Sequence, residues 1–207
     1  MTGAALPALA EEIRIAALGD SLTQGYGLVP EDGLVPQLQR WLNENGQEDV
    51  VIVNAGVSGD TTAGGLARIA WTLEPTTDGL IVALGANDML RGIDPAVSRA
   101  NLAGILDAAR GSGLPVLLVG MESAGNYGPD YKAAFDGMYP ELAESYGTRL
   151  FPSLLRPVAA EGDGVGPLDP ALMQSDGTHP NRDGVARIVE ALGPSVAGLA
   201  QDIRNGS

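Results

Sequence analysis

Four short apolar runs rich in β-branched residues recur along the chain, and they constrain its fold more than any other feature. They cover residues 13–18, 50–53, 80–84 and 116–119, and Arg14 is the one polar residue within them. Continuous runs of this length are typical of strands that are buried on both faces of a parallel sheet. A fifth, weaker run at residues 149–151 would complete a five-stranded sheet.

Segments with a helical spacing of apolar residues separate these runs. The clearest is residues 95–110, where Asp94 fits the N-cap position and Pro95 the first helical position. Strict alternation of strand and helix predicts right-handed crossovers, with helices on both faces of a mostly parallel sheet. Three helices are expected to bury an apolar face: Leu102, Ile105, Leu106 and Ala109 in this helix, Val35, Leu38 and Leu42 in a second, and Leu66, Ile69, Ala70 and Leu73 in a third. Two further helices are expected at residues 133–146 and 185–199.

The chain length and the absence of repeats or linkers predict one domain over residues 1–207. Residues 161–174 form a Gly/Pro-rich loop, which is long for a compact fold and therefore a candidate functional segment. Ala8-Leu9-Ala10 has the small-x-small form of a signal-peptidase site, although the basic and long apolar regions of a signal are missing. We interpret residues 1–12 as the trimmed end of a signal or a frayed terminus, which favours a periplasmic or secreted protein.

Composition excludes several classes of function. The 26 acidic and 12 basic residues give a net charge of -14, which repels nucleic acid. No apolar run approaches the roughly 20 residues that a membrane-spanning helix needs. The chain has one histidine and no cysteine, which argues against metal catalysis and excludes thiol chemistry. We therefore expect a monomer without metal, cofactor or nucleic acid, acting on a small-molecule substrate.

Polar, glycine-bearing turns follow the first three predicted strands, at residues 19–22, 54–61 and 85–88, and a fourth such turn, at residues 176–180, is expected to open the last helix. Ligands of open parallel sheets bind at the carboxyl ends of the strands. Four such turns meeting at one edge of the sheet are therefore the predicted active site.

Ester hydrolysis needs a nucleophile, a base and a group that orients the base. Ser21 follows the first strand directly and can be the nucleophile, or it can merely N-cap the next helix. His179 can be the base, and Asp176 lies three residues before it. That spacing lets the carboxylate reach Nδ1 of the histidine and leaves Nε2 facing Ser21.

The reaction also needs donors for the oxyanion. Gly59 can offer a backbone N–H, Asn87 its side-chain amide, and Ser21 its own N–H. The alternatives are that Asn87 is a left-handed turn residue and that Gly59 only leads into a helix.

These four segments together resemble the SGNH, or GDSL-type, hydrolase family. The resemblance is carried by GDSL at Ser21, NAGVSGDT at Gly59, GAND at Asn87 and DGTHP at His179. It implies that Ser21, Asp176 and His179 are the catalytic triad, and that Gly59 and Asn87 complete the oxyanion hole with the Ser21 amide.

Within the family, the stretches GDSLTQGYGL, SGDTTAGGLARI, LGANDMLRGI and DGTHPNRDG are similar to the bacterial subgroup of multifunctional thioesterase I, lysophospholipase and arylesterase. That resemblance implies a flavodoxin-like three-layer α/β/α sandwich, periplasmic location, and cleavage of acyl thioesters, aryl esters and lysophospholipids. It also implies that the loop after Asn87 contacts the acyl group, through Met89, Leu90 and Ile93, although ordinary packing explains these three equally well.

Other enzyme classes lack their motifs in this chain. No G-x-S-x-G elbow surrounds Ser21, no G-x-G-x-x-G follows the first strand, and no G-K-[ST] occurs. The sequence therefore predicts a serine esterase that forms an acyl-serine intermediate. The alternatives left open are a carbohydrate-ester deacetylase of the same family and a non-catalytic flavodoxin-like binding protein, which would not need the triad.

Overall fold

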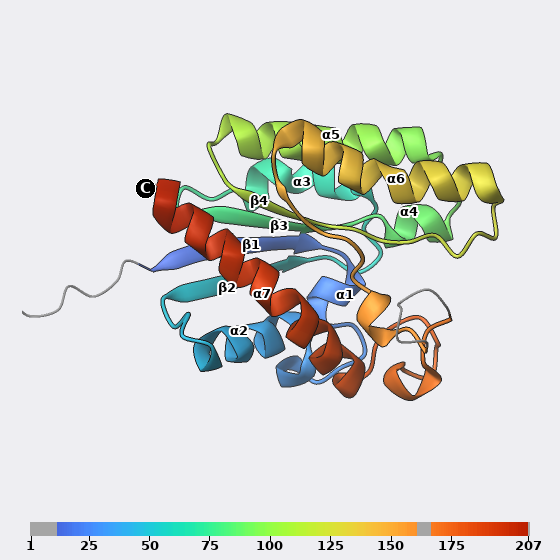
Figure 1. Cartoon of the computed structure of the whole chain (residues 1–207), viewed down its shortest axis with the longest axis horizontal. Coiled ribbons are helices and arrows are strands. Elements are labelled where there is room, and N and C mark those ends of the chain that lie inside the picture. Colours follow the sequence, from blue (N-terminus) through green and yellow to red (C-terminus); the bar gives the residue numbers. More distant parts are fainter. Residues whose placement is uncertain (1–11, 161–166, 207) are drawn as a thin grey trace, which may run out of the picture.

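A five-stranded parallel sheet forms the centre of the protein in the computed structural model, which describes residues 12–160 and 167–206 (Figure 1). The strands lie in the order β2-β1-β3-β4-β5, and every neighbouring pair is parallel. They are β1 (Ile13–Gly19), β2 (Val50–Gly56), β3 (Gly79–Ala83), β4 (Val116–Val119) and β5 (Arg149–Phe151). All five predicted strands are thus confirmed, including the weak last one.

Helices cover both faces of this sheet (Figure 1). On one face lie α3 (Thr62–Thr72), α5 (Pro95–Gly111) and α6 (Pro129–Tyr146), and on the other lie α2 (Leu34–Glu44) and α7 (Arg182–Gly206). Two short helices, α1 (Ser21–Gln24) and α4 (Ala86–Leu90), follow β1 and β3, and 3-10 turns occur at Pro30–Asp32, Arg156–Val158 and Pro170–Leu172. The predicted three-layer α/β/α sandwich is confirmed.

Helix α5 shows how local sequence signals and packing agree. Asp94 caps it, because its carboxylate accepts a hydrogen bond from Ala96 N at 2.9 Å, and Pro95 occupies the first turn. The four apolar residues of its predicted face, at positions 102, 105, 106 and 109, are all buried. The strands β3 and β4 are buried along their whole length, as expected for strands covered on both faces.

The predicted apolar face of α3 is partly wrong. Ala70 is exposed, whereas Leu66, Ile69 and Leu73 contact the core, Leu73 as the residue that caps the end of the helix. The helix contacts the sheet through Ile69 and through Gly65, where a Cβ would lie only 2.3 Å from Leu84 Cδ1. This close approach at Gly65 is the part of the buried face that the apolar residues alone do not indicate.

Two predictions concern residues that the structure does not describe. Residues 1–11 of the proposed signal remnant and residues 161–166 of the Gly/Pro-rich loop lie outside the described part. The rest of that loop is anchored by a bridge between Ala159 and Leu168. Among the described residues, no helix is both long and apolar enough to cross a membrane.

Candidate active site

The carboxyl ends of three strands meet at one edge of the sheet. Gly19, at the end of β1, pairs with Gly56 of β2 on one side and with Ala83 of β3 on the other. The segments after these strands therefore start side by side, and α1 and α4 both lie at this end of the sheet (Figure 1). The predicted meeting of these segments at one edge of the sheet is confirmed.

Ser21 is the first residue of α1, and Asp20 is the residue that caps this helix. The Asp20 carboxylate accepts a hydrogen bond from Leu22 N at 3.0 Å. The alternative in which Ser21 serves as the helix cap is therefore wrong, and its hydroxyl remains available for other partners. Gly19 is needed just before it, because a Cβ there would lie 2.0 Å from Thr23 Oγ1.

Ser21, His179 and Asp176 form one hydrogen-bonded chain. His179 Nε2 lies 2.9 Å from Ser21 Oγ, and His179 Nδ1 lies 2.7 Å from Asp176 Oδ2. The other carboxylate oxygen of Asp176 accepts hydrogen bonds from the backbone N–H groups of Thr178 and His179, at 2.9 and 3.0 Å. The contact between the Asp176 carboxylate and His179 Nδ1 that this spacing of three residues predicted is thus confirmed.

The histidine turn is closed by its own backbone and precedes the last helix. Gln174 N donates to His179 O at 2.7 Å, and Gly177 adopts a left-handed conformation with φ of 66°. Helix α7 starts only after Asn181, whose Oδ1 accepts from Asp183 N and Gly184 N at 3.0 Å each. The sequence predicted that this turn opens the last helix, and that prediction is wrong: the turn ends at Pro180, and α7 begins at Arg182.

Hydrogen bonds to Asp176 lower the pKa of its carboxyl to about 2, chiefly those from the backbone N–H groups of His179 and Thr178 and then the one from the His179 ring. Asp176 is consequently ionised throughout the neutral range. An ionised acceptor at Nδ1 keeps the proton on that nitrogen and leaves Nε2 free to accept the Ser21 proton.

Gly59 and Asn87 approach the serine from the two neighbouring segments. Gly59 has φ of 84°, which a side chain would strain, and its N–H donates to no acceptor in the described part of the chain. Asn87 lies in the first turn of α4, and no residue described other than glycine has a positive φ, so the left-handed alternative for Asn87 is wrong. Its Nδ2 donates to Asp20 Oδ2 at 3.3 Å, which leaves a second amide hydrogen available.

Two supporting groups were missed by the sequence analysis. Asp88 is fully buried, and its carboxylate accepts from Thr62 N at 2.8 Å, from Thr62 Oγ1 at 2.5 Å and from Ser98 Oγ at 2.9 Å. It therefore fastens α4, which carries Asn87, to α3 and α5. The acidic residue directly after Asn87 was the only signal in the sequence.

Arg68 joins the ends of two other segments. Its Nε donates to Asp60 Oδ2 at 2.6 Å, and its Nη2 donates to the Gly19 carbonyl at 2.9 Å. The Gly59 segment and the turn that carries Ser21 are thereby linked. Nothing in the local sequence around Arg68 distinguishes it from a surface arginine.

Asp20 is an acid buried directly beside the serine, with 1% of its surface exposed. Burial raises the pKa of the Asp20 carboxyl to about 6, against the opposing effects of the Leu22 N–H, of His179 and of the Asn87 amide. The folded protein therefore binds a proton here more tightly than the unfolded chain, whose reference pKa is 3.8.

This shift predicts a pH-dependent cost to stability. Between about pH 4 and pH 6, Asp20 holds more protons in the folded state than in the unfolded state. The contribution of Asp20 to the free energy of unfolding therefore falls as pH rises through this range and levels off above pH 6. Asp20→Asn keeps a side-chain cap for α1 but cannot ionise. In urea unfolding at each pH, the variant should gain stability over the wild type from pH 4 to 6. A difference that stays constant, or that shrinks, contradicts the assignment.

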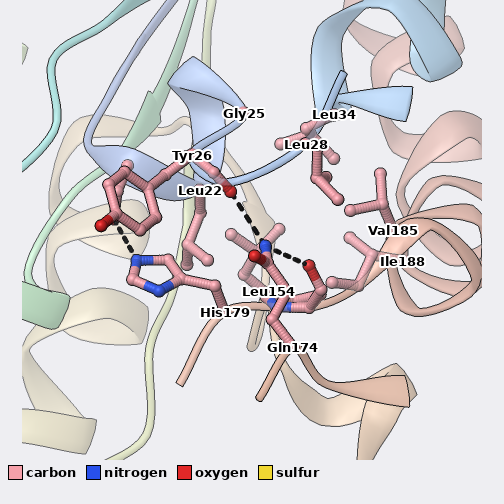
Figure 2. Close-up of a pocket in the computed structure, with 12 residues that line it drawn as sticks. Leu22, Gly25, Tyr26, Leu28, Leu34, Leu154, Gln174, His179, Val185 and Ile188 are labelled. Atoms are coloured by element: carbon pink, nitrogen blue, oxygen red, sulfur yellow. Dashed lines mark hydrogen bonds between the residues drawn. The ribbon is translucent and has the colours of Figure 1, made fainter. Parts of the chain in front are cut away.

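A narrow, mostly apolar cleft opens beside Ser21 and His179 (Figure 2). The Tyr26 ring lies 4.7 Å from the His179 ring, centre to centre. Gln174 Nε2 donates to Tyr26 O at 2.9 Å and to Pro180 O at 3.0 Å, so this amide closes one side of the cleft (Figure 2). The apolar lining comes from Leu22, Leu28, Leu34, Leu154, Val185 and Ile188.

The predicted acyl-contacting residues do not line this cleft. Met89 is half-buried against the core, Leu90 is 58% exposed, and Ile93 is half-buried. Tyr127 and Tyr131 hold this loop, because their hydroxyls donate to Leu90 O at 3.3 Å and to Ile93 O at 3.0 Å. Contact between these three residues and an acyl group stays a prediction.

The site and fold agree with what comparison of the whole chain shows. Residues 17–187 match the GDSL-like Lipase/Acylhydrolase family. The chain belongs to this family, and it is a hydrolase of carboxylic esters.

Relatives of similar length support this class. The chain is 39% identical to Esterase TesA of Pseudomonas aeruginosa, over 89% of this chain and 88% of TesA. It is 37% identical to Thioesterase 1/protease 1/lysophospholipase L1 of Escherichia coli K12, over 80% and 74%. A crystal structure of AlinE4, an SGNH-hydrolase family esterase, superposes with a TM-score of 0.75 at 42% identity and covers 92% of this chain and 98% of AlinE4. None of these three names supports the deacetylase or the non-catalytic binding protein over the serine esterase.

Proposed function

We propose that Ser21 is the nucleophile, His179 the general base and Asp176 the group that orients the base. The observation that supports this most strongly is the unbroken chain of contacts, 2.9 Å from Ser21 Oγ to His179 Nε2 and 2.7 Å from His179 Nδ1 to Asp176. These separations lie within the range for proton transfer along a hydrogen bond.

In the proposed reaction, His179 Nε2 takes the hydroxyl proton while Ser21 Oγ bonds to the carbonyl carbon of the ester. The negatively charged Asp176 stabilises the imidazolium that forms. The tetrahedral intermediate collapses when its bond to the leaving oxygen or sulfur breaks and His179 returns the proton to that atom. Water, deprotonated by His179, then attacks the acyl-Ser21 ester, and the acid is released with Ser21 regenerated.

The charge on the carbonyl oxygen is proposed to meet three donors, namely the backbone N–H groups of Ser21 and Gly59 and the free amide hydrogen of Asn87. Asp20 accepts the other Asn87 hydrogen and so fixes the plane of this amide. Each well-placed donor contributes roughly 3–4 kcal/mol to lowering the barrier.

The substrates proposed are aryl esters, acyl thioesters and lysophospholipids. The relatives named esterase and thioesterase/lysophospholipase support this range, and the lining of the narrow cleft beside Ser21 is mostly apolar. We propose further that Met89, Leu90 and Ile93 contact the acyl chain, that the protein is a monomer, and that it acts in the periplasm or outside the cell.

A chain-length series tests the substrate range. p-Nitrophenyl esters from acetyl to palmitoyl are compared with acyl-CoA thioesters and a lysophospholipid, and kcat/KM is measured for each. We expect hydrolysis of all three classes, with kcat/KM rising from acetyl to medium chains because each buried methylene contributes about 0.8 kcal/mol. Activity confined to acetyl esters would contradict the proposal and favour a deacetylase.

A further inference from the structure

Arg91 is an exposed cation at the edge of the proposed oxyanion hole. Its backbone N–H donates to Asn87 O at 3.2 Å, so it lies one helical turn after Asn87 and on the same side of α4. Its Nη2 donates to the Gly59 carbonyl at 2.8 Å. The guanidinium is therefore flanked by both segments that would bind the oxyanion.

In the described part of the chain Arg91 has no carboxylate partner, although acidic residues are abundant. The chain has 26 acidic and 12 basic residues, and nine of the basic ones lie within 4.0 Å of a carboxylate. Among the described residues, only Arg40, Arg91 and Arg187 lack such a partner, and Arg40 and Arg187 belong to the helices α2 and α7 on the opposite face of the sheet. An arginine next to Gly59 that has no carboxylate partner in the described part of the chain is thus a local exception in an acidic protein.

We propose that Arg91 binds a phosphate group that the substrate carries close to its scissile acyl bond. This inference rests on the proposed function. A guanidinium has five N–H donors in a planar fork that matches phosphate oxygens, and Gly59 O occupies only part of this fork. The negative field of the rest of the chain repels anions in general, so a phosphate is held only where a local cation offsets that field.

The position of Arg91 limits how far the phosphate lies from the ester. Gly59 O, which accepts from the guanidinium at 2.8 Å, and Gly59 N, which would bind the oxyanion, belong to one residue, so Arg91 Nη2 lies at most ~10 Å from the oxyanion position. A phosphate separated from the acyl oxygen by a three-carbon glycerol fits this spacing. The phosphates of an acyl-CoA lie much further from the thioester and do not.

The experiment compares two esters that differ only in the phosphate. Hexanoate release is measured from 1-hexanoylglycerol 3-phosphate and from 1-hexanoylglycerol, at concentrations where both are monomeric. The ratio of kcat/KM for the two esters is expected to fall about tenfold in Arg91→Gln, because charge-assisted hydrogen bonds to phosphate are lost. Arg91→Lys should keep part of the ratio, and added NaCl should lower it in the wild type.

Arg40→Gln is the matched control. Arg40 is exposed, lacks a carboxylate partner and donates to a backbone carbonyl, that of Glu31 at 2.9 Å, so its removal changes the net charge equally. It should leave the ratio unchanged. A ratio that stays unchanged in Arg91→Gln overturns the proposal. An equal loss of kcat/KM on both esters, which leaves the ratio unchanged, would indicate that Arg91 acts on the reaction or on the Gly59 segment instead.

A second pair separates the two sources of phosphate. Hexanoyl-CoA and S-hexanoyl-N-acetylcysteamine share the thioester and differ in the distant phosphates, so Arg91→Gln should leave their ratio unaltered. If Arg91→Gln lowers the kcat/KM ratio only for the CoA pair, the spacing argument is wrong and the proposal is overturned. Failure of the proposed function is distinct, because then the wild type hydrolyses neither neutral compound, or Ser21→Ala retains the activity.

Discussion

Ser21→Ala should lower kcat for p-nitrophenyl esters about a millionfold and leave the fold intact. The change removes the oxygen that His179 Nε2 contacts, so no acyl-enzyme can form. Stability should be nearly unaffected, because Asp20 rather than Ser21 caps α1. The measurements are single-turnover and steady-state kinetics, with thermal unfolding as the check on the fold.

Ser58→Ala is the matched control for this variant. Ser58 is an exposed serine in the neighbouring segment, and its Oγ donates to Gln24 Oε1 at 3.0 Å. Its loss should change kcat less than threefold, since that hydrogen bond is exposed and worth about 1 kcal/mol or less. A Ser21→Ala protein whose kcat stays within tenfold of the wild type would contradict the mechanism.

His179→Ala should cost as much as the loss of the serine, and the double variant should be no worse than either single one. The two groups act as a unit, because the serine is deprotonated only as the histidine accepts its proton. Asp176→Asn should lose less, about ten-thousandfold, because the imidazole keeps its place while its tautomer is no longer enforced.

The control for the histidine turn is Thr178→Ala. It removes a hydroxyl that donates to Asp176 O at 3.3 Å but keeps the Thr178 backbone N–H that binds the Asp176 carboxylate. Its kcat should stay close to the wild-type value. Additive losses in the Ser21/His179 double variant would mean that the two residues contribute independently, which is incompatible with a shared proton transfer.

The fold was predictable because its strands are continuous and buried on both faces. β3 and β4 contain only apolar residues and glycine, and such runs leave few alternatives to a parallel sheet. The start of α5 was also predictable, because its signal is local: Asp94 and Pro95 mark it without contributions from the rest of the chain. The buried face of α3 was not, because it depends on how closely Gly65 lets the helix approach Leu84.

The contacts among Ser21, His179 and Asp176 were predictable for a different reason. Asp176 and His179 are three residues apart in one turn, so their contact is nearly a local property. Asp88 and Arg68 act across 26 and 49 residues of sequence, through partners that only the folded chain brings near. The assignment of the α1 cap to Asp20 rather than Ser21 likewise depended on backbone angles that the motif does not reveal.

Covalent trapping tests the central claim most directly. The protein is incubated with diethyl p-nitrophenyl phosphate, and released p-nitrophenolate, intact mass and a peptide map are measured. We predict one p-nitrophenolate and one diethylphosphoryl group per chain, attached to Ser21, loss of esterase activity in proportion, and no label in Ser21→Ala. A stoichiometric label on another residue, or full loss of activity with Ser21 unmodified, would contradict the account.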